Sequence, residues 1–327
     1  MSKIDLKDRK ILYELDLDCR QSNSQIGKKV GLGRDVVAYR RNNMEEEGLI
    51  KNYWTVIDTF KLGYDVFRIY IDFQYITNDI KNEIIKYFVD YKNSWVVATI
   101  KSEIDLDVVL WVKNIFDFYK FWNKTLDKYE EYFEKYSISI YIQANVYEKS
   151  YLLSGFDNVK LKKDREICKQ TCGQTTVEID ELDYKLLNEL AENARAPLID
   201  IADKFNCSSQ TINYRIKNLI KSGVIKAFRV DVDISKLNLQ SYKVDIYLKN
   251  HKMKKPIIEY LESKTYLEFM NLALGWADLE PEFVVKNLEE LVNILDEINS
   301  KFSGAIKKQS FFVTDKQYKL SCLPELF

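Results

Sequence analysis

The chain repeats itself. When the sequence of 327 residues is shifted by 175 positions, residues 4–62 align without a gap with residues 179–237, and 19 of these 59 positions are identical. A period this long indicates a duplicated module rather than a solenoid of short repeats. The segments that follow match more weakly, residues 105–114 against 278–287 at a shift of 173. The chain therefore consists of two copies of one unit.

Composition excludes several classes of protein. Lys and Arg total 49 and Asp and Glu total 50, so overall basicity does not hold this protein on nucleic acid, although a local basic helix still can. The one histidine, His251, leaves little material for a Ser-His-Asp triad or a multi-histidine metal centre. The five cysteines form no CxxC pair, which favours reduced thiols without a metal or other cofactor. No apolar run is long enough to span a membrane, and the charged start lacks the apolar core of a secretory signal, so we expect a cytoplasmic protein.

The first segment of the second copy predicts a winged helix-turn-helix. Asp180 is a plausible N-cap for a first helix with leucines at helical spacing, and a second helix is predicted over 198–205. Ser208 can cap a third helix over 209–221, which ends at Gly223 and leads into a strand. Two short helices, a turn, a third helix and a strand are typical of this DNA-binding unit.

The third helix of the second copy is the predicted recognition helix. Its outward hydroxyl and amide side chains have the reach and chemistry to contact base edges; they are Ser209, Gln210, Asn213 and Tyr214. Arg215 and Lys217 are the predicted phosphate contacts on its basic face. The alternative for Arg215, and for its counterpart Arg40 in the first copy, is a structural ion pair.

The first copy shows the same pattern with differences. Its third helix is predicted over 34–47, and its DNA contacts are predicted to be Arg34, Tyr39 and Arg40. Arg41 stands where the second copy has the buried Ile216, which suggests that its charge reaches the edge of the core or that the helix is shifted. The three acids of 45–47 offset much of the local positive charge. We therefore expect this copy to bind DNA more weakly or to be partly structural.

The second segment of each copy predicts a small α/β domain. Residues 67–75 alternate between apolar and polar side chains, as a half-buried strand does. The predicted order of elements is βαββαβ, the ferredoxin-like arrangement. In the first copy the elements are expected over 67–75, 78–91, 95–100, 106–112, 115–135 and 137–147. In the second they are expected over 242–249, 256–263, 267–274, 281–285, 288–301 and 307–314. The long helix of the first copy carries more aromatic residues than one buried face needs, so part of it is expected to meet another domain or subunit.

The fold class predicted from these patterns is α+β, a tandem duplication of a winged helix-turn-helix followed by a ferredoxin-like domain. The predicted helix-turn-helix domains are 1–57 and 179–233. The predicted α/β domains are 58–150 and 234–327, and the polar stretch 151–178 is read as a linker.

This order of parts resembles the Lrp/AsnC, or feast/famine, transcriptional regulators. The motifs that carry the resemblance are residues 4–12, 48–53 and 179–183, together with the exit Ser222-Gly223-Val224-Ile225-Lys226. The resemblance implies sequence-specific binding to double-stranded DNA, self-association through the α/β domains, and an amino acid or other small-molecule effector bound near a turn with glycine and aspartate. The corresponding residues are Gly275, Trp276 and Asp278 in the second half and Asp105 in the first, where the glycine is missing.

The prediction is therefore a DNA-binding regulator and not an enzyme, with one chain supplying both halves of a pseudodimer that reads an asymmetric site. Two alternatives stay open. Siroheme decarboxylases also resemble this family and work as two related halves, so a tetrapyrrole enzyme is one. A DNA-architectural or adaptor protein with little sequence preference is the other.

Overall fold

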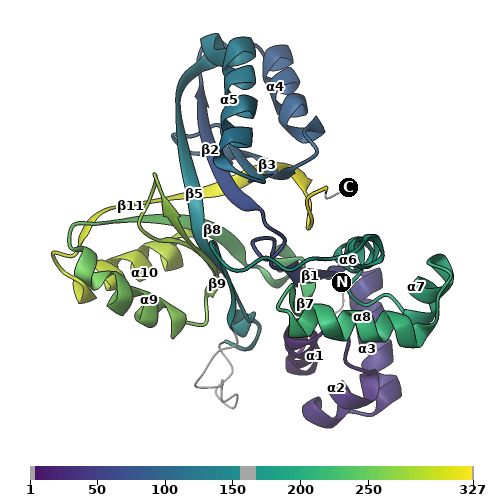
Figure 1. Ribbon diagram of the computed structural model, residues 1–327. Helices are drawn as coiled ribbons and strands as arrows, with labels where there is room; N and C mark the ends of the chain where they lie inside the picture. The colour runs from purple at the N-terminus through teal and green to yellow at the C-terminus, as the bar shows by residue number, and fades with distance from the viewer. Residues whose placement is uncertain (1–3, 155–166, 326–327) are drawn as a thin grey trace.

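The computed structural model describes residues 4–154 and 167–325. Each copy begins with a three-helix unit, and the two units lie together at one end of the molecule (Figure 1). The first unit contains α1 (Leu6–Leu17), α2 (Asn23–Val30) and α3 (Arg34–Glu46). The second contains α6 (Glu181–Glu192), α7 (Leu198–Lys204) and α8 (Ser209–Lys221). Both predicted helix-turn-helix units are thus confirmed, and the third helix of the second unit has the predicted bounds.

Short polar side chains fix where these helices begin. The Asp180 carboxylate accepts the Asp183 backbone N–H at 2.8 Å, and the Asp183 carboxylate accepts the Asp180 N–H at 3.4 Å. This reciprocal capping box satisfies two backbone donors that the first turn of a helix leaves free. The Ser208 hydroxyl accepts the Thr211 N–H at 3.1 Å and so starts α8, while Gly223 takes a positive φ of 79° after its end.

The strand that leaves each helix-turn-helix pairs with its counterpart from the other copy. β1 (Ile50–Ile57) and β7 (Ile225–Val232) form an antiparallel two-stranded sheet between the copies. The Asp58 N–H donates to the Val224 carbonyl at 2.8 Å, and the Asp233 N–H donates to the Leu49 carbonyl at 2.8 Å. Because these two bonds are related by the repeat, the two units face each other about an approximate two-fold axis.

The remaining strands form one barrel-like sheet. Among the described residues, eight strands follow one another in the order β2-β4-β3-β11-β8-β10-β9-β5, and β5 also pairs with β2, which closes the ring. The first half contributes β2 (Asp65–Phe73), β3 (Ser94–Lys101), β4 (Leu106–Val112) and β5 (Phe133–Tyr147). The second half contributes β8 (Gln240–Leu248), β9 (Leu267–Leu274), β10 (Glu280–Val285) and β11 (Ile306–Leu320).

The alternation of side chains gives each strand two environments. Phe67, Ile69 and Ile71 of β2 pack in an apolar cluster with residues of α4 (Asn78–Asp90) and α5 (Ile115–Tyr129). The intervening Arg68 and Tyr70 lie on the opposite, inward face. In the second half α9 (Lys254–Glu262) and α10 (Leu288–Lys301) cover the sheet in the same way (Figure 1). The helices therefore cover the apolar faces of the strands, and the polar faces of the strands line the inside of the barrel.

The α/β part differs from the prediction in its organisation. The predicted order of helices and strands is present in each half, but the sheets are joined edge to edge by β5–β9 and β3–β11 instead of forming two separate ferredoxin-like domains. The long aromatic helix also ends earlier than predicted, at Tyr129, because η1 (Glu130–Tyr132) and the start of β5 follow it.

The stretch between the halves carries ordered structure of its own. η2 (Ser150–Leu153) is buried against α1, and β6 (Ile167–Thr171) pairs with the end of β5. Part of the predicted linker, residues 155–166, lies outside the described residues. Two short 3-10 helices complete the second half, η3 (Ile234–Leu237) and η4 (His251–Met253).

Candidate nucleic-acid interface

The outward face of α8 is polar and open to solvent. Gln210, Asn213 and Lys217 are exposed, and Tyr214 keeps 66% of its surface exposed. Ser209 is half-buried at the N-terminus of the helix. The opposite face packs into the core through Ile212, Ile216 and Leu219. The four residues predicted to contact bases thus lie on or beside one accessible surface, with Lys217 next to them.

Arg215 does not point freely to solvent. Its guanidinium binds the Asp180 carboxylate at 2.7 Å and the Asp183 carboxylate at 2.8 Å, so it ties α8 to the capping box of α6. Arg40 makes the same two contacts in the first copy, with Asp5 at 2.9 Å and Asp8 at 2.8 Å. Hydrogen bonds to Asp183 and Asp180 raise the pKa of Arg215 above its ordinary value. This geometry favours the structural ion pair over the phosphate contact for both arginines.

The outward face of α3 has different chemistry at the same positions. Arg34 and Asp35 are exposed where α8 has Ser209 and Gln210, and Tyr39 is 67% exposed like its counterpart Tyr214. Both copies therefore present a tyrosine at the same place, on faces that otherwise differ in charge and in hydrogen-bonding groups.

Arg41 reaches polar partners without shifting its helix. Its Nη1 donates to the Asn23 side chain at 3.3 Å, and its Nε lies 3.4 Å from the Glu45 carboxylate. Glu45 also accepts the Tyr53 hydroxyl at 2.5 Å. Because the half-buried Glu45 is bound to Arg41 and Tyr53, it offsets less of the positive charge on the outward face than the sequence suggested.

Buried charges at the base of the first helix-turn-helix are not predicted by the sequence. The fully buried Arg229 of β7 donates to the Asp16 carboxylate of α1 at 3.1 Å, and that carboxylate also accepts the Lys149 N–H at 2.8 Å. The Lys149 ammonium in turn binds Glu268 of β9. These contacts connect the DNA-binding end to the barrel. Single charged residues spread over 16–268 give no local pattern that would have revealed them.

The turns predicted to bind an effector already have structural partners. The Asp105 carboxylate accepts the Phe73 N–H at 2.9 Å, and Asp278 accepts the equivalent Leu248 N–H at 2.7 Å. A Cβ atom on Gly275 would lie 2.5 Å from the Ile138 carbonyl oxygen of the other half. Gly275 therefore allows two backbone segments of the protein to approach each other closely. The sequence predicts that a glycine here allows close approach of a ligand, whereas the segment that approaches it belongs to the protein.

Trp276 is also engaged within the protein. Its indole N–H donates to the Asp245 carboxylate at 2.7 Å, and its ring packs 4.9 Å from that of Tyr70.

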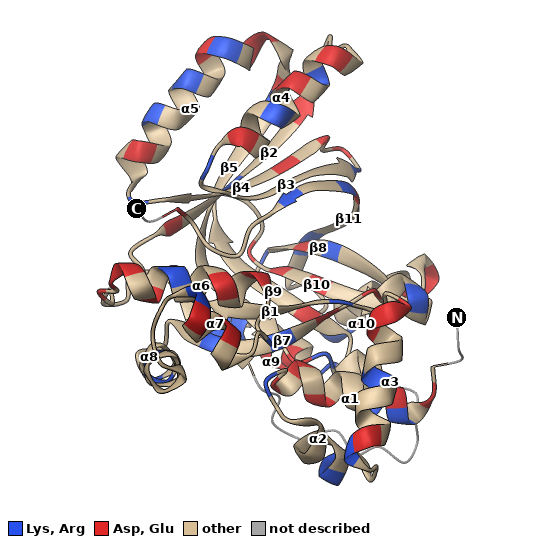
Figure 2. Cartoon of the chain, turned by 90° about the vertical axis from the view of Figure 1, so that its right-hand side faces the viewer, with Lys and Arg blue, Asp and Glu red and all other residues tan. Residues whose placement is uncertain are grey.

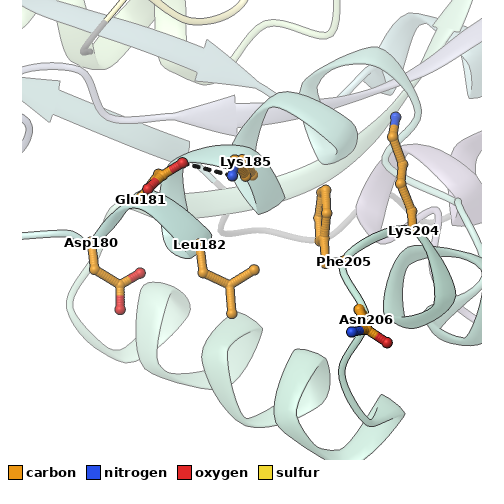
Figure 3. Close-up of a pocket in the computed structure, with 7 residues that line it drawn as sticks. All are labelled: Asp180, Glu181, Leu182, Lys185, Lys204, Phe205 and Asn206. Carbon is orange, nitrogen blue, oxygen red and sulfur yellow. Dashed lines mark ion pairs between the residues drawn. The ribbon is translucent and has the colours of Figure 1, made fainter.

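Two surface depressions lie elsewhere. One, of about 670 Å³, lies in the second helix-turn-helix between the start of α6 and the end of α7 (Figure 3). Lys185 and Glu181, both on α6, pair at 2.6 Å on one side of it. The other, of about 470 Å³, lies at the β3–β11 seam beside α4, and its charged lining residues are Lys81, Lys101 and Asp315. None of the four predicted effector residues lines either depression.

All five cysteines are free thiols. Within the described ranges, no group of three His, Cys, Asp or Glu side chains is placed to hold a metal ion, and no helix is long and apolar enough to cross a membrane. His251 lies exposed in η4, 3.7 Å from Asp278. Figure 2 shows cationic and anionic residues interspersed over the whole molecule.

Comparison with known proteins agrees with the helix-turn-helix units. The winged helix-turn-helix DNA-binding family matches residues 4–51 and 179–226. An uncharacterised HTH-type transcriptional regulator of Pyrococcus horikoshii is 25% identical over 138 residues, which cover 42% of this chain and 87% of the relative. The regulatory protein AsnC of Haemophilus influenzae is 37% identical over 86 residues, 26% of this chain and 57% of the relative.

A solved structure matches nearly the whole chain. The siroheme decarboxylase NirDL superposes with a TM-score of 0.63 at 12% identity and covers 96% of this chain and 93% of its own. At this identity the match shows a shared fold alone. The two matched helix-turn-helix segments and the relatives named above support a regulator of the Lrp/AsnC type with two tandem copies of the helix-turn-helix unit.

Proposed function

We propose that this protein is a sequence-specific DNA-binding transcriptional regulator in which the two halves of one chain act as a pseudodimer. The observation that carries the proposal is the pairing of β1 with β7, which holds two recognition helices in one fixed relation. A dimer of this kind reads two half-sites at a spacing set by the protein. Relatives named as transcriptional regulators support the same function.

The two recognition helices would read unlike half-sites. α8 offers Gln210 and Asn213, whose amides match the hydrogen-bonding edge of adenine, whereas α3 offers Arg34, which suits guanine. Lys217 of α8 stands where α3 has the neutral Asn42, so phosphate contacts would be stronger on the second half-site. The operator is therefore asymmetric. Selection of bound DNA from a random pool tests this directly.

A small-molecule effector, an amino acid in the first instance, would act at the β3–β11 seam. Lys81 and Lys101 offer cations for a carboxylate, and Asp315 offers an anion for an ammonium group. Lys101 and Asp315 pair with each other at 2.6 Å, so an amino acid would exchange this ion pair for contacts with its own charged groups. Lys81 also lies 3.7 Å from Asp105, one of the predicted effector residues. Binding here would bridge the two halves, since β3 and β11 come from different copies. Calorimetric titration with the individual amino acids tests this, and the absence of heat for all of them would exclude it.

The two alternatives have distinct outcomes. For a tetrapyrrole enzyme, an iron porphyrin added to the protein would give a shifted absorption band, and the exposed position of His251 argues against such a role. For an architectural protein, footprints would cover DNA with little preference for sequence.

A further inference from the structure

The inside of the barrel holds two equivalent ion pairs, one from each half. Arg68 of β2 binds Asp107 of β4, with Nε 2.6 Å from a carboxylate oxygen. Lys243 of β8 binds Glu280 of β10 at 2.7 Å. The repeat relates Arg68 to Lys243 at a shift of 175 and Asp107 to Glu280 at a shift of 173. All four side chains are buried, so the interior holds one matched cation–carboxylate pair from each half.

These two pairs are also bonded to each other. The Arg68 guanidinium lies 3.3 Å from the Glu280 carboxylate of the other half. The Lys243 ammonium donates to the Tyr70 hydroxyl of the first half at 2.5 Å. The charged groups inside the barrel therefore contribute directly to the join between the halves.

Asp245 breaks this symmetry. It stands on β8 where the first half has Tyr70, and it is 1% exposed. Its Oδ2 accepts the Trp276 indole N–H, while its Oδ1 has no hydrogen-bond partner, and neither does Oε1 of Glu280. Asp245 thus adds a carboxylate without a cation of its own to an interior that also holds the two ion pairs and Glu282, which lies on the same face of β10 as Glu280 and accepts the Ser241 hydroxyl at 2.5 Å.

A buried carboxylate without a cation is costly when ionised, and it keeps its proton to a higher pH than usual. Burial, and then the negative charge of Glu280, raise the pKa of Asp245 to about 7. Burial raises the pKa of Glu280 to about 7 as well. The other charged or titratable groups that face Asp245 from the surrounding strands are Arg68, Tyr70, Asp107, Lys243 and Tyr247.

The partner of Asp245 lies at the contact between the halves. The Trp276 ring packs against Tyr70 of the first half, and the adjacent Gly275 lies against the backbone at Ile138. A negative charge on Asp245 therefore acts directly on the contact between the two halves.

We infer that Asp245 is a proton-binding site of the barrel interior, and that the gain or loss of its proton controls the contact between the two halves. Below neutrality Asp245 is protonated and carries no charge. Above it the proton leaves to solvent, and an uncompensated negative charge remains at the join and weakens it.

The wild-type protein tests the site by nuclear magnetic resonance. The indole ¹H–¹⁵N signal of Trp276, assigned by its loss in Trp276→Phe, should move with pH with a midpoint near 7, since its acceptor changes charge. In Asp245→Asn the movement should disappear. A Trp276 signal that stays fixed between about pH 5.5 and 8.5, or that moves equally in Asp245→Asn, overturns the inference.

Denaturant unfolding gives a second, independent readout. When folding raises the pKa of an acid, the folded protein loses stability as pH rises from the pKa of the unfolded state to that of the folded state. The free energy of unfolding of Asp245→Asn should therefore increase relative to that of the wild type between about pH 4 and 7. The unfolding constant of the wild type, relative to that of the variant, should rise by up to tenfold per pH unit in this window and level off above it.

The matched control is the exposed Asp296→Asn on α10, which should show no such trend. A ratio for Asp245→Asn that is constant with pH contradicts the inference. Both measurements use the protein without DNA, so failure here leaves the proposed function untouched.

Discussion

Arg20 and Arg195 occupy equivalent positions in the two copies, and each guanidinium binds the backbone of the opposite copy. Arg20 donates to the carbonyl oxygens of Ala194 at 2.7 Å and Ala196 at 3.3 Å. Arg195 donates to those of Cys19 and, at 3.0 Å, Gln21. The repeat relates the acceptors as well as the donors, so this is the contact expected between the subunits of a symmetric dimer, here made within one chain.

Arg20→Ala should therefore loosen the two helix-turn-helix units from each other. Carbonyl groups that lose a charged donor in a partly buried site cost about 1–3 kcal/mol of stability. Arg195→Ala should cost a similar amount, because its environment is equivalent. Denaturant titration measures the loss, and Lys124→Ala, an exposed cation on α5, should change stability by less than about 0.5 kcal/mol. A loss from Arg20→Ala no larger than that of Lys124→Ala would contradict the assigned contact.

Two substitutions on α8 should separate affinity from specificity. Lys217→Ala removes a proposed phosphate contact, so binding should weaken equally on all sequences and the slope of log affinity against log salt should fall by about 1. Asn213→Ala should instead change the preferred base at one position, with a cost of about 1–3 kcal/mol on the preferred site alone. Binding assays across a salt series check both. Equal effects of Asn213→Ala on all sequences would show that this residue does not read bases.

Arg215→Ala should behave as the loss of a positioning contact. Because its guanidinium is bound to Asp180 and Asp183, its removal should lower DNA affinity by misplacing α8 and leave the salt slope unchanged. Arg215→Lys should recover little, since a lysine cannot span both carboxylates with the same geometry. A fall of about 1 in the salt slope on Arg215→Ala would return Arg215 to the phosphate contacts first predicted from the sequence.

Gly275→Ala should destabilise the seam between the halves more than an ordinary glycine substitution. Its φ of 96° is unfavourable for alanine, and the added Cβ would lie 2.5 Å from the Ile138 carbonyl oxygen. Gly304→Ala is the matched control, with a φ of 76° and no atom within 4 Å of the added Cβ. The control should cost about 1 kcal/mol and Gly275→Ala at least about 2 kcal/mol more, measured by thermal unfolding. Equal losses would mean that the seam can open to accommodate the methyl group.

Local patterns predicted the local structure well. Capping residues and helical spacing predicted α8 and α10 with their observed bounds. Short apolar runs predicted the bounds of β4 and β9. These elements are short, periodic and bounded by turns, so their signals lie within the segment itself.

Strands that depend on partners far away in the sequence were not predicted correctly. The last strand was predicted over 307–314, but β11 continues to Leu320 because its second part pairs with β3 of the other half. The polar residues 315–319 do not read as a strand without that neighbour. The same limit explains β6, and the pairing of β1 with β7, since no local pattern states which strand lies beside which.

The candidate site was predicted in part. The accessible face of α8 follows from helical spacing, as expected for a regular element. The partners of Arg215 and Arg40 did not follow, because the carboxylates that bind them are 32–35 residues earlier in the chain. The buried Asp245 was also invisible, since an aspartate on an alternating strand reads as a solvent-facing residue.

In the proposed pseudodimer, the two halves read one asymmetric DNA site. Selection of bound duplexes from a random pool, followed by sequencing, is the decisive measurement. We expect an enriched sequence with two unlike half-sites at a single spacing, and loss of preference in only one half-site with Asn213→Ala. Recovery of a palindrome, of variable spacing, or of no enriched sequence would contradict it.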